Sequence, residues 1–524
     1  MSHSLTPYLG LGLSLATFFV FARGILNRSR GRDFNPLPVF ILLMLTVGAA
    51  FLPSKEAFVE AYGFAGFGST VLDRFTKILL DFGIGLLLNG AFLAYKREPA
   101  KIFVVPGIFA IVLSGMLYGI VQVFQVFSGT CAFGTKDKPT TVELLIELGP
   151  DDTICELKQT LSRYHADYER TFDEVTMEEN PDLAQYYTVY VDSMQVAALQ
   201  AELTEDRENI DNAERNKAVR LIEPGASVAT PATASRPFSN DPMLAQQWYA
   251  VKLAYDQVYT LLAGAKPQKR AVVAILDTGI DAEHEDISSV FGGGKATTDT
   301  HGHGTHCAGL AGAATNNAKG IASLNWEGKY IQLKAYPALG ANGSGSQRSI
   351  AQAIIQAAED GADVISLSLG GYSPKAPKVT KDAIAYARSL GAIVVVAAGN
   401  SNMDAQNFTP ANIDGVITVS AVDANFNKAS FSNTNTTLKM PIAAPGVGIM
   451  SAVPAGKYVA WDGTSMATPI VAGIIGVMRA FQPQLSTEKA YEMLYKTGVS
   501  AADADKTGRV VQPAQAISLT AKAL

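Results

Sequence analysis

Short apolar runs alternate with stretches of helical spacing from about residue 269 to the C-terminus, and this alternation restricts the fold more than any other feature of the chain. Most of these runs are too apolar to leave one face in water, which is typical of strands buried on both faces. The alternation therefore predicts an α/β domain, a parallel sheet with helices on both faces. The expected strands are 271–276, 330–336, 364–369, 393–398 and 416–422, and the expected helices are 347–359, 379–390 and 487–496.

Four polar residues lie where functional residues of such folds are usually found, beyond the carboxyl ends of strands or at helix starts. Asp277 directly follows the first strand, His303 opens the block HGTHCAG, and Asn400 ends the run VVVAAGN. Ser465 precedes an apolar run typical of a buried helix, so its Oγ would lie at a helix N-terminus, which favours negative charge. Together they supply an orienting carboxylate, a base, an oxyanion donor and a nucleophile, the set needed for acyl transfer.

Each of these residues also has a simpler interpretation. Taken singly, Asp277 and Ser465 could be helix caps and Asn400 a turn residue. A cluster of histidines could instead bind zinc, as in a metal-dependent hydrolase: His301, His303 and His306. No HExxH motif accompanies these histidines. The joint occurrence of all four residues in order favours acyl transfer, and His301 and His306 then have structural roles.

Four sequence blocks carry a resemblance to a known family. They are DTG at 277–279, the glycine-rich block that begins at His303, AGN at 398–400 and GTSMATP at 463–469. Their order, Asp then His then Ser, is that of subtilisin. From about residue 241 to its end the chain resembles the subtilisin-like serine proteases, or subtilases, and most of all their thermitase and proteinase K branches. The resemblance implies a serine endopeptidase that needs no cofactor for catalysis.

The resemblance also implies a role for each site residue. Ser465 is the nucleophile, His303 the general base, Asp277 the residue that orients it, and Asn400 the oxyanion donor. Polypeptide substrates would lie extended between two segments and bind through main-chain hydrogen bonds. The residues carried over for this role are Gly343, Ser344 and Gly345 on one side, Ser368, Leu369 and Gly370 on the other, and Ala398 and Gly399 in the pocket wall.

A structural calcium site is a further implication of the resemblance. Its side-chain ligands would be Asp241, Asp286 and Asn317. Its remaining ligands would be the backbone oxygens of Ala314, Lys319 and Ile321. Ligation by oxygen alone suits a hard cation such as Ca²⁺.

The N-terminal part of the chain, residues 1–130, holds four long apolar runs, at 5–22, 37–51, 78–95 and 102–127. They approach or exceed the roughly 20 residues that cross a bilayer as a helix, and are too long and too uncharged for buried core helices. Arginines and lysines crowd the first and third connections, which predicts that these connections are cytoplasmic. We therefore expect a multi-pass membrane protein in contact with lipid, whose peptidase domain lies on the extracytoplasmic side.

The middle of the chain, 138–224, predicts a small α+β domain. Its expected strands are 141–148, 185–192 and 218–222, and its expected helices are 153–175 and 194–203. This order suits a ferredoxin-like sandwich and resembles subtilase propeptides, although a permanent juxtamembrane domain fits it too. Residues 225–240 are rich in Ala, Ser, Thr and Pro, which predicts an exposed linker. We expect self-cleavage in this linker, which would allow release of the peptidase domain, 241–524.

Charge and cysteine content limit the remaining functions. Lys and Arg number 42 against 48 Asp and Glu, and the net charge of -6 argues against a nucleic-acid partner. Cys131 and Cys155 could form a disulfide or remain two thiols, whereas Cys307 has the apolar surroundings of a buried residue. Outside enzymes, the chief alternative is a catalytically silent membrane receptor or scaffold with a protease-like domain.

Overall fold

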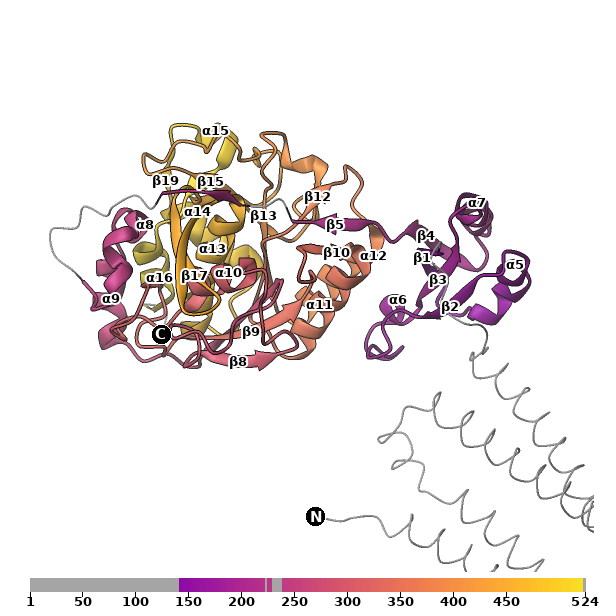
Figure 1. Ribbon diagram of the computed structural model, residues 1–524, viewed down its shortest axis with the longest axis horizontal. Coiled ribbons are helices and arrows are strands. Elements are labelled where there is room, and N and C mark those ends of the chain that lie inside the picture. The colour runs from indigo at the N-terminus through magenta and orange to yellow at the C-terminus, as the bar shows by residue number, and fades with distance from the viewer. Residues whose placement is uncertain (1–140, 222–223, 229–237, 522–524) are drawn as a thin grey trace, which may run out of the picture. The chain divides into compact units, whose positions relative to one another are not determined.

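The computed structural model describes residues 141–221, 224–228 and 238–521 (Figure 1). The predicted membrane region, 1–130, lies outside the described residues. Within the described part, one helix is long and apolar enough to cross a bilayer, Thr464–Phe481, and all of it is buried inside the protein. It is therefore the core helix of its domain.

A nine-stranded, mostly parallel sheet forms the centre of the C-terminal domain, in the order β19-β20-β16-β15-β13-β11-β7-β9-β8. Neighbouring strands from β20 to β8 run parallel, and only β19 pairs antiparallel. All five expected strands are present, which confirms the predicted α/β class. The bounds are β7 Ala271–Asp277, β8 Phe291–Gly294, β9 Ile331–Pro337, β11 Val364–Leu367, β13 Ile393–Ala397, β15 Ile417–Val422, β16 Pro441–Pro445, β19 Val499–Ser500 and β20 Arg509–Val510.

Two helical layers cover the sheet, and alternate residues of each strand face one layer or the other. Val273 and Ile275 of β7 belong to the core shared with α9, α10, α13 and α16, whereas Ala274 and Leu276 belong to the core shared with α11 and α12. Helices α11 and α12 lie side by side (Figure 1). The bounds are α9 Tyr255–Gly264, α10 His303–Gly312, α11 Gln347–Glu359, α12 Lys378–Ser389, α13 Thr464–Phe481, α14 Thr487–Thr497 and α16 Pro513–Ala521, so the three predicted helices are confirmed.

Local chemistry explains where these helices begin. The capping box of α11 satisfies its first N–H groups: Ser349 N donates to Ser346 Oγ over 3.1 Å, and Ser346 N donates to Ser349 Oγ over 2.8 Å. Helix α13 begins after Gly463 and is buried on all sides, as expected for a helix that contacts the sheet and other helices at once. Its second residue is Ser465, which is thereby fixed at the carboxyl end of the sheet.

The small domain contains four antiparallel strands in the order β2-β3-β1-β4. The predicted helix over 153–175 is wrong in its second half, because the helix ends at Arg163 and a strand, β2, follows. The predicted strand 218–222 does not join this sheet, whose last strand is β4. The bounds are β1 Thr141–Leu148, η1 Ile154–Leu157, α5 Lys158–Arg163, β2 Asp167–Arg170, α6 Pro181–Ala184, β3 Tyr186–Asp192, α7 Val196–Glu205 and β4 Ile210–Arg215.

The chain after the small domain pairs with the C-terminal domain. Strand β5, Ala218–Arg220, is antiparallel to β10, Ser344–Ser346. Strand β6, Gly225–Ala226, is antiparallel to β18, Lys457–Asp462. The first residues of the predicted exposed linker, Gly225 and Ala226, are exposed, and they also pair with β18, which the sequence did not predict.

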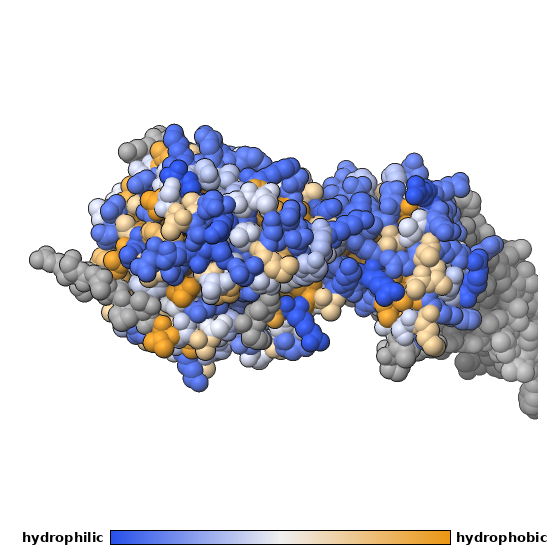
Figure 2. Space-filling view, turned by 90° about the horizontal axis from the view of Figure 1, so that it is seen from above, coloured by the Kyte–Doolittle hydropathy of each residue, from blue (hydrophilic) through white to orange (hydrophobic). Residues whose placement is uncertain are grey.

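The remaining elements cover the edges of the C-terminal domain. They are η2 Pro242–Gln246, α8 Trp248–Lys252, β12 Gly371–Tyr372, η3 Ala405–Asn407, β14 Phe408–Thr409, β17 Ile449–Val453 and α15 Ala504–Thr507. Figure 2 shows a face of the described residues that is largely hydrophilic, with apolar residues scattered over it. Such scattering is usual for a surface in contact with water.

The contact between α10 and α13 permits a stability test at Gly473. A Cβ atom added there would lie 2.5 Å from the carbonyl oxygen of Ala311, a backbone atom that cannot turn aside. We expect Gly473→Ala to lower the free energy of unfolding by about 1–3 kcal/mol, because overpacking outweighs the helix propensity gained. Gly264→Ala is the control, because a Cβ at this last residue of α9 meets nothing within 4 Å. Thermal unfolding measures both; equal melting temperatures would contradict this account.

Candidate active site

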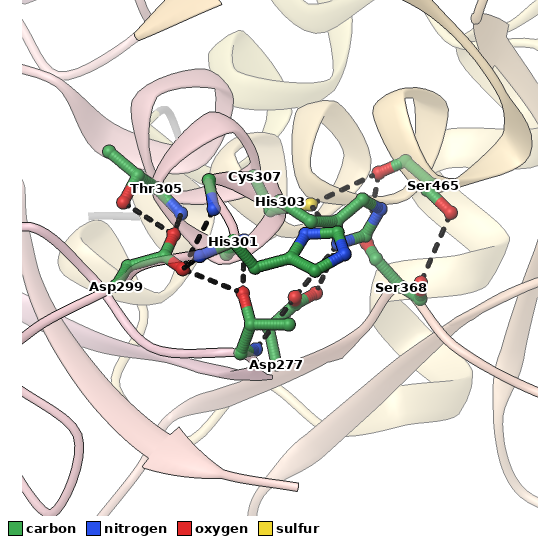
Figure 3. A network of polar contacts seen from close by, with 11 residues as sticks. Asp277, Asp299, His301, His303, Thr305, Cys307, Ser368 and Ser465 are labelled. Atoms are coloured by element: carbon green, nitrogen blue, oxygen red, sulfur yellow. Dashed lines mark hydrogen bonds and ion pairs between the residues drawn. The ribbon is translucent and has the colours of Figure 1, made fainter. Parts of the chain in front are cut away.

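A buried carboxylate and a buried imidazole meet at the carboxyl end of the sheet (Figure 3). Asp277 is the last residue of β7, and His303 is the first residue of α10. His303 Nδ1 lies 2.8 Å from Asp277 Oδ1 and 2.9 Å from Oδ2. Gly302 precedes the helix with φ of 100°, a left-handed conformation that favours glycine and turns the chain into α10. The sequence thus places both groups on rigid elements.

The carboxylate controls the protonation of the imidazole. Burial lowers the pKa of His303, but the negative charge of Asp277 and its hydrogen bond to the ring outweigh burial, so the pKa lies above its usual value. His303 Nε2 is buried and has no hydrogen-bond partner among the described residues. The ring is therefore held through Nδ1, and Nε2 remains able to accept a proton.

Ser465 lies beside this pair, in the first turn of α13. Its Oγ donates to the carbonyl oxygen of Ser368 over 3.1 Å, and Ser368 Oγ donates to the carbonyl oxygen of Ser465 over 2.9 Å (Figure 3). The structure therefore brings the predicted nucleophile to the site without a bond from its Oγ to His303. In the absence of substrate such bonds are often long or unformed, and they tighten in the substrate complex.

Asn400 is oriented by the residue before the serine. Its Oδ1 accepts hydrogen bonds from Thr464 N over 2.9 Å and from Thr464 Oγ1 over 2.8 Å. Because Oδ1 is occupied in this way, the Nδ2 group is left to donate into the pocket that Asn400 and Ser465 share. This is the arrangement that an oxyanion donor requires. The role of Thr464 was not predicted, although its place beside Ser465 offered a signal.

One pocket contains most of the predicted substrate-binding residues. It is lined by Ser368, Leu369, Gly370, Ala398, Gly399, Asn400 and Ser465, and also by Leu221, Ala397, Phe408, Thr409 and Thr464. Phe408 and Thr409 were missed, because strand β14 reaches the pocket from a loop without a sequence motif. The predicted segment at 343–345 lies instead along β5: Gly345 pairs with Val219, and Leu221 N donates to the carbonyl oxygen of Gly343 over 2.8 Å.

The neighbouring histidine and cysteine are structural, as predicted. The pKa of His306 is lowered to about 3, mainly by burial and to a smaller extent by the charge of His303. The His306 ring stacks on Trp461, with ring centroids 4.6 Å apart. Cys307 is fully buried, and burial raises the pKa of its thiol, which disfavours the reactive thiolate form. Among the described residues, the group with metal-ligand spacing is Asp277, His303 and Cys307, not the three histidines considered for zinc.

The residues predicted to bind calcium also come together. Asn317 N donates to Asp241 Oδ1 over 3.1 Å, and Asn317 Nδ2 donates to Asp286 Oδ1 over 3.1 Å. Burial raises the pKa of both carboxyl groups, and neither joins an ion pair with another described residue. Two uncompensated buried acids fit a divalent cation. Asn317 would have to turn its amide, because Nδ2 and not Oδ1 faces Asp286.

The three residues predicted to supply backbone ligands each contact Asp286 or Asn317. Ala314 N donates to the carbonyl oxygen of Asp286 over 2.9 Å, and Ile321 N donates to Asp286 Oδ2 over 2.8 Å. Lys319 N donates to Asn317 Oδ1 over 2.8 Å. All three contacts are made by backbone N–H groups. They do not test the prediction that the carbonyl oxygens of these residues bind calcium.

The sheet, its two helical layers and a serine at the start of a buried helix define a serine peptidase of the α/β type. The model of the subtilase family, Peptidase S8, matches residues 268–512. Thermitase from Thermoactinomyces vulgaris is 38% identical over 247 residues, which cover 46% of this chain and 84% of that protein. Subtilisin DY from Bacillus licheniformis is 38% identical over 245 residues, which cover 45% of this chain and 86% of that protein. Subtilisin Savinase from Lederbergia lenta is 40% identical over 233 residues, which cover 44% of this chain and 83% of that protein. The chain belongs to the subtilase family and is a subtilisin-type serine endopeptidase.

The raised pKa of His303 leads to a prediction on pH dependence. The imidazole must be neutral to accept a proton, so kcat/KM should rise with pH as His303 loses its proton. Asp277→Asn removes the charge that raises this pKa, so the rising limb should move to lower pH while the rate falls by about 10⁴-fold. A pH profile of kcat/KM for both proteins measures this. A limb that stays in place would show that Asp277 does not control the His303 proton.

Proposed function

We propose that this protein is a membrane-anchored serine endopeptidase that works through Asp277, His303 and Ser465. Ser465 Oγ attacks the substrate carbonyl while His303 Nε2 takes the hydroxyl proton, and His303 then protonates the leaving amine. Asp277 holds the Nδ1–H tautomer and stabilises the imidazolium. Water hydrolyses the resulting acyl-enzyme by the same proton transfers in reverse. The observation that carries this proposal is the buried Asp277–His303 pair with an unoccupied Nε2 beside Ser465.

The negative charge of the tetrahedral intermediate needs donors, and two are available. Asn400 Nδ2 is free to donate because Thr464 occupies its Oδ1. The backbone N–H of Ser465 lies at the start of α13, where helix N–H groups are unpaired and the dipole favours an anion. Loss of one such donor costs roughly 3–4 kcal/mol of transition-state stabilisation.

We further propose that the chain cleaves itself between Leu221 and Gly225. Strand β5 adds to β10 on one side of the candidate nucleophile, and Leu221 lines the pocket of Ser465. Strand β6 adds to β18, which leads directly into α13. Strands β5 and β6 each have the extended, main-chain-paired form of a bound substrate. This position lies just before the linker in which the sequence predicted the cut.

The small domain would act as an inhibitory propeptide of ferredoxin-like topology. Its contacts with the peptidase domain support this role, because they fall at the starts of α11, which directly follows β10, and of the adjacent α12. Glu214 accepts hydrogen bonds from Lys378 N over 3.3 Å and from Val379 N over 3.2 Å, at the start of α12. Asn216 Oδ1 accepts from Arg348 N over 3.1 Å, at the start of α11. These groups satisfy helix N–H donors that otherwise bond to water.

Replacement of the serine tests the reaction and the self-cleavage together. A fluorophosphonate should label the wild-type chain and fail to label Ser465→Ala, whereas a silent receptor or scaffold would stay unlabelled in both forms. N-terminal sequencing should give a new terminus between residues 222 and 225 for the wild type and none for the variant. Ser500→Ala, at an exposed serine, is the control and should behave like the wild type.

Three outcomes would count against the self-cleavage. A new terminus within 229–240 would place the cut in the linker and contradict the position argued from β5 and β6. A terminus before Thr141 would remove the propeptide role. Cleavage that persists in purified Ser465→Ala would require another protease.

The membrane anchor and the extracytoplasmic location rest on the sequence of residues 1–130 and on one cysteine. Cys155 is disulfide-bonded, whereas Cys307 is free. Cys131, the partner that the sequence suggests for Cys155, lies outside the described residues. A disulfide supports an oxidising compartment, which agrees with the outer side of a membrane. Sequencing of the termini in membrane and soluble fractions would separate a tethered peptidase from a released one.

A bound calcium ion is proposed for the cluster of Asp241, Asp286 and Asn317, where it would neutralise two buried carboxylates. Removal of calcium with a chelator should lower the melting temperature, and added Ca²⁺ should restore it. At about 100 times its dissociation constant, such an ion stabilises the fold by about 2.7 kcal/mol. Asp286→Asn should melt at one lower temperature with or without chelator. A wild-type melting temperature that ignores the chelator would contradict the site.

A further inference from the structure

A second buried carboxylate, Asp299, lies next to the candidate active site and has no role in the reaction described above. It is 6% exposed and accepts five hydrogen bonds. Its Oδ1 accepts from Thr278 Oγ1 over 3.0 Å, from His301 N over 3.0 Å and from Gly302 N over 2.9 Å. Its Oδ2 accepts from Thr305 N over 2.9 Å and from Thr305 Oγ1 over 2.7 Å. Most of these donors belong to the chain that enters α10, and His303 lies among them (Figure 3).

Thr278 connects this carboxylate to Asp277. Its backbone N donates to Asp277 Oδ1 over 2.8 Å, while its Oγ1 donates to Asp299 and accepts from Gly304 N over 3.1 Å. The same hydroxyl therefore touches the start of α10 and the carboxylate that caps it. Asp277 and His303 belong to two separate segments, and this hydroxyl joins the segments directly beside them.

The two segments also lie in close contact, so a small shift of either would reach the pair. A Cβ atom at Gly304 would lie 2.0 Å from the carbonyl oxygen of Gly279 and 3.1 Å from Asp277 Cβ. Steric contact prevents α10 from moving closer to the turn at 277–279, but it does not prevent the helix from moving away. The hydrogen bonds of Thr278 and Asp299 supply that second restraint.

We propose that Asp299 and Thr278 are positioning residues that fix the His303 imidazole against Asp277 and so set the rate of the chemical step. An ordinary helix cap would accept hydrogen bonds from the N–H groups of α10 and make no contact with the segment that carries Asp277. Here the capping carboxylate is bonded to the residue that follows Asp277, so the helix start and the orienting carboxylate are fixed together. The proposal rests on the triad proposed above, and it assigns no contact with substrate to either residue.

Thr278→Val and Thr278→Ser are a matched pair for the test. Valine keeps the shape and removes the hydroxyl, so it breaks the link to Asp299 and leaves Gly304 N without its acceptor. We expect Thr278→Val to lower kcat by about 10- to 100-fold, the cost of a misplacement of about 1 Å, with KM changed less than about twofold. Thr278→Ser keeps the hydroxyl and should recover most of the lost rate. Asp299→Asn should resemble Thr278→Val, because an amide offers one acceptor oxygen instead of two.

A second background separates positioning from general destabilisation. In Asp277→Ala, the partner against which His303 is positioned is gone, so Thr278→Val should cause little further loss of kcat. Equal losses of kcat in both backgrounds, or a change confined to KM, would overturn the proposal. Melting temperatures identify any variant that fails to fold, and Thr278→Ser then remains the informative comparison. If Asp277→Ala alone keeps full activity, the triad proposal fails instead, which is a distinguishable result.

Discussion

The hydrogen bond between Asp277 and His303 is the interaction on which the rest of the site depends. Both side chains are almost fully buried, and an ionised carboxylate is costly in such surroundings unless donors surround it. The imidazole Nδ1 and the N–H of Thr278 supply these donors. The fold makes this possible because β7 lies inside the parallel sheet and α10 begins directly beyond its carboxyl end. Burial strengthens the interaction of the pair, and the charge of Asp277 outweighs the opposing effect of burial and raises the pKa of His303.

The other site groups are held by helix starts rather than by mobile loops. Ser465 belongs to the first turn of a helix that is buried throughout, so its backbone N–H is fixed where negative charge would develop. Thr464, one residue earlier, orients Asn400. The starts of α10 and α13 therefore converge at one edge of the sheet. A site built in this way loses little entropy when substrate binds, because most of its groups are already ordered.

Burial also decides what could be predicted from the sequence. Five strands of the C-terminal sheet, β7, β9, β11, β13 and β15, were predicted because both of their faces are apolar, whereas β8, β16, β19 and β20 were not predicted. Asp277 and Asn400 were singled out because each follows an apolar run, and His303 and Ser465 because each precedes one. Strands β2 and β4 were missed because DYER and IDNAER are polar and short, and β6 exists only through its pairing with β18. Asp299 was missed for a related reason: three of its five hydrogen bonds come from the backbone N–H groups of His301, Gly302 and Thr305, and backbone donors leave no pattern of residue types in the sequence.

Main-chain and side-chain contacts would have different roles when the enzyme recognises its own chain. Pairing of β5 with β10 and of β6 with β18 uses main-chain groups, which any extended peptide can offer. The contacts specific to the small domain lie away from these strand pairs, at α11 and α12. They use side chains such as Glu214 and Asn216. An inhibitor that binds helix surfaces can be specific, while the substrate-binding strands still accept many peptide sequences. Departure of the small domain would then leave a site suited to many polypeptides, without any change in its binding strands.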